Sequence, residues 1–512
     1  MSSKIMSSSN ENQNLPITLY SAAGIILVLA SYYARKLLIS PKRKRTMSFN
    51  SEVMVRGAFP DKANVAQPII NIFFLFDKAP SIEKLKEASQ TLCKYDRFRS
   101  ATKLNNGQYD FIEVNIDYDK HVLQIDIDSE EDMLNKVDLI NSEDLKGYGE
   151  RPLWCIYRFS NKNGKGLTGV LIRVHHVIGD GISLVSTMVE LFVSQDGKPY
   201  KLDIPIGGAS GQSKNKIKSA SIFSRIFSIF FSAIEVLTLG ATSYDTETFF
   251  FIKKKSTMVM NPSKCKTIIF PTLNLEFVKE IKNKADVSLN DVLLSATTGA
   301  LRKFSEKLND PAISKSNKNT VQLRALLPVA FPRTMEDFSK ALRNKWAFIS
   351  LPLCYNIADC KDRLYATHKV TSERFATPTV LVQYWIQTYL VPLLPKFLAL
   401  QTAFDIFSRH SMVFSNVPGP ANELLFCDQP LLGMQILFPN LLNQVLLISY
   451  GGQIFYNMVV DEDACPQGKE LLPGLFLEEM KELAKRFNVD TNPSFMLAPS
   501  SPEGKFGIVK KI

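Results

Sequence analysis

Apolar and polar positions follow two alternating patterns along most of the 512-residue chain. The apolar runs at 69–77 and 167–176 are short and rich in Ile, Leu, Val or Phe, which predicts buried strands. The stretch from Ser81 to about residue 95 and the stretch 182–193 carry helical patterns, with Ser81 as the N-cap of the first. Because strands and helices alternate throughout, the pattern predicts an α/β layered fold.

The length of the chain fits two domains of about 200 residues each, because one hydrophobic core rarely serves so long a chain. We predict a polar tail (1–14), a transmembrane signal anchor (15–34), a basic linker (35–55), an N-terminal half (56–202), a basic loop and apolar membrane-associated crossover (203–255), a C-terminal half (256–490) and a tail (491–512). The C-terminal half is expected to contain a long helix from Asn290.

Residues 15–34 are apolar and uncharged, and 20 helical residues suffice to cross a hydrocarbon core of about 30 Å. Basic residues follow this stretch and only Lys4 precedes it, whereas a cleavable signal peptide carries its charge first. The positive-inside rule then places the residues after 35 in the cytosol. We expect a single-pass endoplasmic reticulum membrane protein with a cytosolic catalytic part. The alternative locations are the plasma membrane and a lipid droplet. The alternative structure for residues 15–34 is a buried core helix.

A second apolar stretch, 222–241, follows a flexible basic loop. It carries only Arg225 and Glu235 as charged residues and fits either a second membrane span or a helix lying in the membrane interface. Two charges in a bilayer core cost several kcal/mol, which favours the in-plane helix or a shallow hairpin. A third patch, 388–400, is broken by prolines and is not expected to form a straight span.

The net charge of +11 predicts an anionic partner: nucleic acid, an acidic membrane surface or a phosphate-bearing substrate. The basic runs are short, flank apolar segments and do not alternate with aromatic residues, so membrane is favoured over nucleic acid. The seven cysteines form no CxxC pair, which predicts reduced thiols, with neither a disulfide framework nor a metal site.

Candidate chemistry centres on two of the five histidines, His175 and His176, which end the strand 167–176 and precede Gly179-Asp180-Gly181. Adjacent strand residues point to opposite faces, so one ring can enter a cleft while the other packs inside. Imidazole accepts a proton from an alcohol or thiol near neutral pH, and the glycines permit a sharp turn. A hydrogen-bonded pair at a strand end, without catalysis, is the plain alternative. No GxSxG nucleophile motif is present.

The stretch His175-His176-Val177-Ile178-Gly179-Asp180-Gly181 matches the HHxxxDG signature of CoA-dependent acyltransferases. The chain resembles, more narrowly, the bifunctional wax ester synthase/diacylglycerol acyltransferase family. Further matches occur in the family's order at Pro152-Leu153-Trp154, Asn290-Asp291-Val292, Pro328-Val329 with Asn344 downstream, and Ser415-Asn416-Val417-Pro418-Gly419-Pro420. The resemblance covers about residues 55–485. It departs at Arg343, where the family often has glycine, and in the apolar segments added to the compact bacterial members.

The resemblance implies two chloramphenicol-acetyltransferase-like α/β halves with a channel between them. His176 would act as general base, His175 and Gly181 would shape the turn, and Asp180 would hold it by pairing with an arginine. Asn290 and Asp291 would lie where the second half meets substrate, with Asn290 contacting substrate or oxyanion. A plain helix N-cap is the alternative for Asn290. The PLW and SNVPGP stretches are interpreted as structural.

The implied reaction transfers a fatty acyl group from acyl-CoA, a co-substrate, to a fatty alcohol or diacylglycerol, with no cofactor. An anionic CoA suits the basic chain, and an insoluble acceptor suits the anchor and contact with membrane lipid. The alternatives are another acceptor, such as a sterol, a short alcohol or an amine, and a catalytically silent lipid-binding protein. The oligomeric state stays open.

Overall fold

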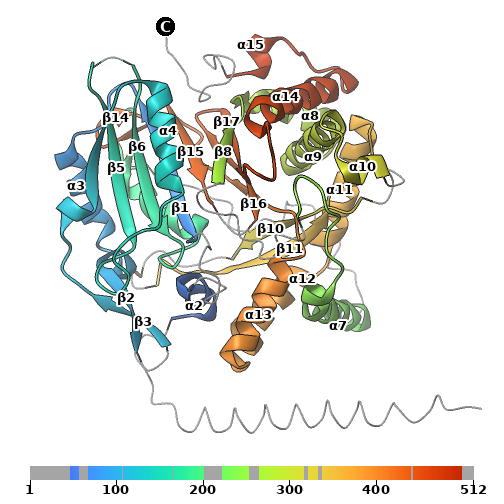
Figure 1. Cartoon of the computed structure of the whole chain (residues 1–512), viewed down its shortest axis with the longest axis horizontal. Helices are drawn as coiled ribbons and strands as arrows, with labels where there is room; N and C mark the ends of the chain where they lie inside the picture. The colour runs from blue at the N-terminus through green and yellow to red at the C-terminus, as the bar shows by residue number, and fades with distance from the viewer. Residues whose placement is uncertain are drawn as a thin grey trace, which may run out of the picture.

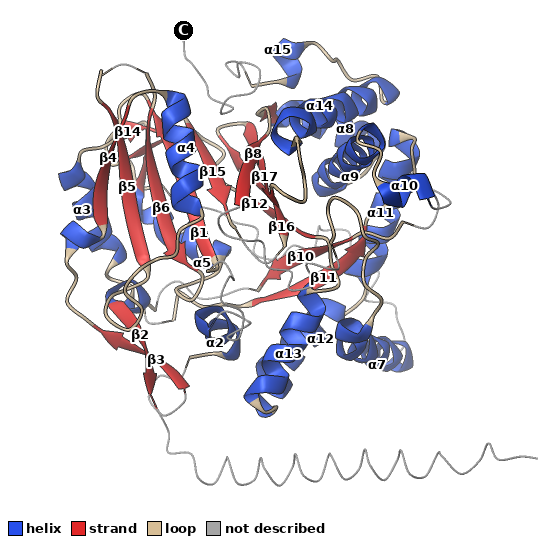
Figure 2. Cartoon of the chain, in the orientation of Figure 1, coloured by secondary structure: helices blue, strands red, loops and turns tan. Residues whose placement is uncertain are grey.

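A computed structural model describes residues 47–56, 67–105, 108–164, 166–200, 222–252, 265–315, 321–331, 337–338, 340–439 and 442–498. The two largest β-sheets, each covered by helices, lie side by side (Figures 1 and 2). The expected mixed α/β fold is confirmed. The predicted anchor, 15–34, lies outside the described residues, and so do the predicted basic loop and both ends of the chain.

The first sheet has the strand order β15-β1-β6-β5-β4. Its strands are β1 (Ile69–Phe76), β4 (Val122–Ile127), β5 (Trp154–Asn161), β6 (Thr168–His175) and β15 (Gly433–Leu437). Every residue of β1 and β6 is buried, so both strands read as continuous apolar runs in the sequence. Helix α3 (Ile82–Leu92), capped by Ser81 as predicted, and helix α4 (Glu130–Asn141) pack against this sheet.

The second sheet has the order β11-β10-β12-β16-β17-β8, and β9 also pairs with β17. Its strands are β8 (Cys265–Ile269), β9 (Leu273–Asn274), β10 (Arg324–Ala330), β11 (Trp346–Pro352), β12 (Met412–Val417), β16 (Asn443–Tyr450) and β17 (Gln453–Asp461). Its main core is shared with several helices, of which the longest are α8 (Leu275–Ala285), α9 (Leu289–Lys307), α11 (Cys360–Ala376) and α14 (Gly468–Arg486). Helix α9 is the predicted long helix.

The described fold has further α-helices and strands. The helices are α2 (Phe49–Arg56), α5 (Gly181–Met188), α7 (Ile222–Thr238), α10 (Pro311–Lys315), α12 (Thr379–Trp385), α13 (Lys396–Phe407) and α15 (Pro493–Met496). The strands are β2 (Ser100–Asn105), β3 (Gln108–Glu113), β7 (Phe192–Ser194), β13 (Leu424–Phe426) and β14 (Gln429–Pro430). A π-helical turn, Ile386–Leu390, and a 3-10 turn, Val391–Leu393, separate α12 from α13, so the patch 388–400 is broken as predicted.

Three segments differ from the sequence-based predictions. The helix predicted over 182–193 is α-helical to Met188 and continues as a 3-10 turn, Val189–Leu191, after which the chain forms β7 beside β13. Part of the predicted linker is helix α2, whose Phe49 and Val53 line a cavity between the halves. The predicted tail begins with α15, and Leu497 bridges to Leu273.

The two halves are interlocked rather than merely adjacent. Strand β15 comes from the C-terminal half but pairs with β1, with Asn71 opposite Leu437. Asn457 on β17 donates from Nδ2 to Gln435 Oε1 and to Ile436 O, both at 2.8 Å, which ties the second sheet to β15. One apolar core cluster contains residues of both halves. The cavity between the halves therefore has firmly joined walls.

Within the described residues, one helix, Ile222–Ala241, is long and apolar enough to cross a membrane by length and composition. It has a mean hydropathy of 1.8 and only 17% of its most apolar window is buried, so it is not a core helix.

We predict that Asn457→Ala lowers the free energy of unfolding by about 1–3 kcal/mol, because it leaves buried hydrogen-bonding groups of β15 without their donor. Guanidinium denaturation followed by circular dichroism measures the change. An unchanged transition midpoint would show that this bond does not stabilise the contact between the halves.

Candidate active site

The histidine pair lies at the end of β6, in the middle of the first sheet. Ile69 of β1 pairs with His175, and the next amide, His176 N–H, donates to Pro68 O at 2.8 Å. The chain then leaves the sheet through residues 177–180 and enters α5 at Gly181. His175 is thus the last residue of a fully buried strand, and His176 follows it directly.

His175 is fully buried and points into the fold. Val177 N–H donates to its Nδ1 at 3.1 Å, so the proton of the neutral ring sits on Nε2, which contacts Tyr148 Oη at 2.5 Å. Burial, with some help from neighbouring His176, lowers the pKa of His175 to about 3. His175 therefore stays neutral and holds the strand end, as the alternation of side chains predicted.

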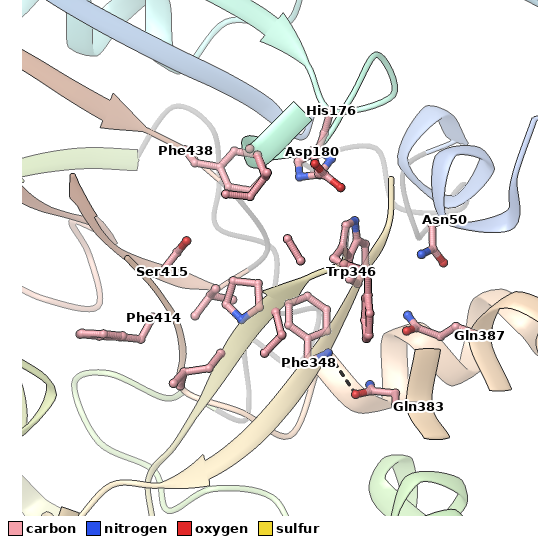
Figure 3. A pocket seen from close by; sticks show the side chains of 18 of the residues that line it. Asn50, His176, Asp180, Trp346, Phe348, Gln383, Gln387, Phe414, Ser415 and Phe438 are labelled. Carbon is pink, nitrogen blue, oxygen red and sulfur yellow. Dashed lines mark hydrogen bonds between the residues drawn. The ribbon is translucent and has the colours of Figure 1, made fainter. Parts of the chain in front are cut away.

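His176 points the other way and lines the cavity. Its ring stacks in a tilted geometry on Phe438, with ring centroids 5.5 Å apart, and meets the edge of Trp346 at 6.5 Å. Its Nδ1 contacts Asn344 Oδ1 at 2.9 Å. In Figure 3 His176 and Asp180 lie together at one end of the cavity, across from Gln383 and Gln387.

The hydrogen bonds of Asn344 determine which nitrogen of His176 carries the proton. Asn344 Nδ2 donates to His176 O at 2.8 Å and to Ser51 Oγ at 3.0 Å, which identifies its other atom as the carbonyl oxygen. That oxygen can only accept, so His176 Nδ1 must be the donor. Nε2 is left with a free lone pair, the form that a general base needs.

Ser51 and Arg97 support this arrangement from outside the cavity. Arg97 Nη1 donates to Val177 O at 2.9 Å, to Ile178 O at 3.2 Å and to Ser51 Oγ at 3.3 Å. Burial lowers the pKa of Arg97 to about 9, so it keeps its charge at neutral pH. Helix α2, through Ser51, and the arginine together fix the turn that follows His176.

Asp180 joins the turn of the first half to the second half. Its Oδ1 accepts from Ser183 N and Ser183 Oγ, both at 3.0 Å, which makes it the N-cap of α5. Its Oδ2 accepts from Lys345 N at 2.9 Å, just before β11. The carboxylate also interacts electrostatically with Arg97. These contacts fit the predicted role of holding the turn.

The two glycines of the motif differ in their surroundings, and neither has a positive φ. A Cβ at Gly179 would lie 2.6 Å from Ser183 Oγ and 3.2 Å from Leu342 Cδ2. A Cβ at Gly181, which lines the cavity, would have no atom within 4 Å. Close packing thus requires Gly179, whereas Gly181 leaves space beside the cavity.

The second half brings Asn290 to the cavity but not Asp291. Ser288, and not Asn290, is the N-cap of α9, and it forms a capping box with Asp291. Asn290 Oδ1 accepts from Asn416 Nδ2 at 2.6 Å. Asp291 is buried and instead accepts from His368 Nδ1 at 2.8 Å and from Thr371 Oγ1 at 2.6 Å, so it anchors α9 to α11.

The cavity has a volume of about 1180 Å³, large for a small-molecule site. Its walls are mostly aliphatic and aromatic and come from both halves. Ser415 and Pro418 line it, so the SNVPGP stretch, interpreted as structural, also forms part of the wall. The PLW stretch has the structural role expected of it: Trp154 is buried and donates from Nε1 to Phe98 O at 2.8 Å.

Burial lowers the pKa of His176 below its ordinary 6.5, while Asp180 and the Asn344 bond partly oppose this. The ring is therefore neutral at neutral pH and faces a largely apolar cavity. Among the described residues, no three His, Cys, Asp or Glu side chains gather as metal ligands. The arrangement can take a proton from a hydroxyl bound near Nε2.

Sequence reasoning noted Asn344 without giving it a role and missed Ser51 and Arg97. The Asn344–His176 contact joins residues 168 positions apart, and the Arg97–Ser51 contact joins residues 46 apart. No local pattern in one sequence carries such pairings.

A family model described as the WS/DGAT C-terminal domain matches residues 342–484. Wax ester synthase/diacylglycerol acyltransferase 8 of Arabidopsis thaliana is 26% identical over 472 residues, covering 81% of this chain and 91% of the relative. Wax ester synthase/diacylglycerol acyltransferase 9 of the same plant is 25% identical over 384 residues, covering 68% of this chain and 78% of the relative.

Solved structures show the same fold. A wax ester synthase/diacylglycerol acyltransferase from Marinobacter aquaeolei VT8 has a TM-score of 0.59 at 18% identity, covering 87% of this chain and all of that one. The first condensation domain of the CDA synthetase has a TM-score of 0.54 at 10% identity, covering 90% and 100%.

Gly179→Ala is expected to destabilise the fold by about 1–3 kcal/mol through overpacking against Ser183 and Leu342. Gly181→Ala, the matched control two residues away, is expected to leave the unfolding midpoint nearly unchanged. Thermal unfolding of both variants makes the comparison. Equal midpoints for the two variants would contradict the different packing of the two glycines.

Proposed function

The chain belongs to the wax ester synthase/diacylglycerol acyltransferase family and is an acyltransferase, and on that premise we propose that it esterifies a long-chain alcohol or diacylglycerol with a fatty acyl group from acyl-CoA. The observation that carries the proposal is the His176 ring, held with Nδ1 toward Asn344 and its other nitrogen free, at the wall of a large apolar cavity.

In the proposed reaction the acceptor hydroxyl binds near His176 Nε2 and the acyl-CoA thioester lies against it. Nε2 takes the hydroxyl proton as the alcohol oxygen attacks the thioester carbonyl. The tetrahedral intermediate then collapses, the C–S bond breaks, and the CoA thiolate receives the proton from the imidazolium. No covalent enzyme intermediate forms, which agrees with the lack of a nucleophile motif in the sequence.

Other residues are assigned positioning roles. His175 and Asp180 hold the strand end and the turn, and Asn344 keeps the ring in its reactive tautomer. Asn290, which lines the cavity on the second half, is the proposed polar contact to the substrate. Gly181 leaves room beside the cavity. The cytosolic orientation at the endoplasmic reticulum stays part of the proposal, because acyl-CoA is available on that side.

We expect His176→Ala to lower kcat/KM by about 10²–10⁴-fold, because the base is removed. Asn344→Ala should lower it by about 10²-fold, because the ring loses its orientation while Nε2 remains. Purified membranes with labelled acyl-CoA and either hexadecanol or diacylglycerol provide the assay and also compare the two acceptors. Wild-type rates in His176→Ala would exclude the base assignment, and the absence of any ester in wild type would exclude the reaction.

The pH dependence gives a second test of the base. His176 must be neutral to accept a proton, and its pKa lies below 6.5, so the fall of kcat/KM on the acidic side should have its midpoint below pH 6.5. Asn344→Asp keeps an acceptor at Nδ1 but adds a negative charge, which should raise the pKa of His176 and move the decline to higher pH. An identical acidic limb in both proteins would contradict the contact between these side chains.

A further inference from the structure

Helix α7 lies against the protein with its polar side inward. Ser232, which is buried, contacts Thr379 Oγ1 of α12 at 3.0 Å. Glu235 forms an ion pair with Arg374 at the end of α11 and accepts a hydrogen bond from Thr379 at 3.2 Å. A helix on a protein surface in water normally shows the reverse arrangement, with the apolar stripe inward and the polar face outward.

The outward side of α7 is apolar. Nine large hydrophobic side chains between Ile222 and Leu237 are exposed, among them Phe223, Phe227 and Phe230. At about 100° per residue these nine cover roughly 200° of the helix circumference, about twice the stripe that packing against one neighbour requires. Water is therefore a poor surrounding for this face.

The apolar surface continues onto the elements beside α7. Leu381 and Trp385 of α12, Tyr389 of the π-helical turn and Phe397 of α13 are all exposed, and α7, α12 and α13 lie together on one side of the molecule (Figure 1). Trp and Tyr combine an apolar ring with a polar tip and favour membrane interfaces. A continuous exposed apolar area of this kind marks an interaction site.

The cavity reaches this surface. Leu237 at the end of α7 and Leu390 of the π-helical turn are both exposed and both line the cavity. His176 lines the same cavity on the side of the first half. The exposed face and His176 therefore border the same, largely apolar cavity.

We propose that α7, α12 and α13 form a membrane-docking surface that sits in the interfacial region of a phospholipid bilayer. This surface would hold the end of the cavity at Leu237 and Leu390 against the acyl chains of the lipids. A lipid acceptor could then enter the cavity sideways from the membrane. Lateral entry rests on the proposed function, whereas docking does not. The occupant is lipid rather than protein because the apolar arc is wider than one groove-bound helix face and aromatic side chains border it.

The same contacts decide how α7 meets the bilayer. Its Ser232 and Glu235 bonds hold it along α12 and α11, so it cannot cross the membrane without carrying the folded body with it. It therefore lies in the plane of the interface.

Trp385 provides a direct test of docking. It is exposed, whereas Trp154 and Trp346, the two other tryptophans of the chain, are buried. The full-length enzyme is reconstituted into phosphatidylcholine vesicles with and without bromine on the acyl chains. We expect brominated lipid to quench a fluorescence component that Trp385→Phe removes. Quenching of the same size in Trp385→Phe would come from Trp346 in the cavity and would overturn docking, as would no quenching at all.

The functional consequence is tested with Phe227→Asp/Phe230→Asp, and Leu139→Asp is the control, because Leu139 is equally exposed on α4, away from this face. We expect the double variant to lose about tenfold or more of its activity on an acceptor dissolved in vesicles, with little change on a short water-soluble alcohol. Leu139→Asp should match wild type on both. Wild-type activity of the double variant on the acceptor dissolved in vesicles would overturn lateral entry. Inactive wild type with quenched Trp385 would overturn only the proposed reaction.

Discussion

The site depends on one hydrogen bond across the two halves, from His176 Nδ1 to Asn344 Oδ1. The histidine belongs to the first sheet and the asparagine to the approach to β11 in the second, so the bond exists only when both are in place. Asn344 also holds His176 O and Ser51, and Arg97 holds Ser51 and the next two carbonyls. The reactive tautomer is thus a property of the assembled molecule.

The other residues of the HHxxxDG stretch hold His176 in the position that this bond requires. His175 is bound to Tyr148 and to the Val177 amide within the fold. These bonds immobilise the backbone from which the His176 side chain projects. The Asp180 carboxylate accepts hydrogen bonds from two backbone amides, one in each half. Burial then keeps both rings neutral, so the cavity contains a base without a permanent charge that would have to be hydrated.

Local patterns predicted what local physics determines. The buried strands β1 and β6, the Ser81 cap and the opposite directions of the two imidazoles follow from side-chain period and capping chemistry. The pattern failed where distant segments decide. Asp291 was expected to contact substrate beside Asn290, but its carboxylate accepts hydrogen bonds from His368 and Thr371 of α11. The helical segment after Gly181 stops at Leu191, two residues before its predicted end, where β13, more than 200 residues away, pairs with β7.

The place of β15 has a consequence for how the protein is made. The edge of β1, an Ile- and Phe-rich strand, is completed by residues 433–437, so it stays open while some 360 further residues are synthesised. At about 5–20 residues per second that interval lasts roughly 20–70 s. During it the first half exposes an unpaired apolar strand, the kind of edge that pairs with other chains. A truncated product ending before β15 is therefore an aggregation hazard, and the nascent chain is a natural client for chaperones that shield strand edges.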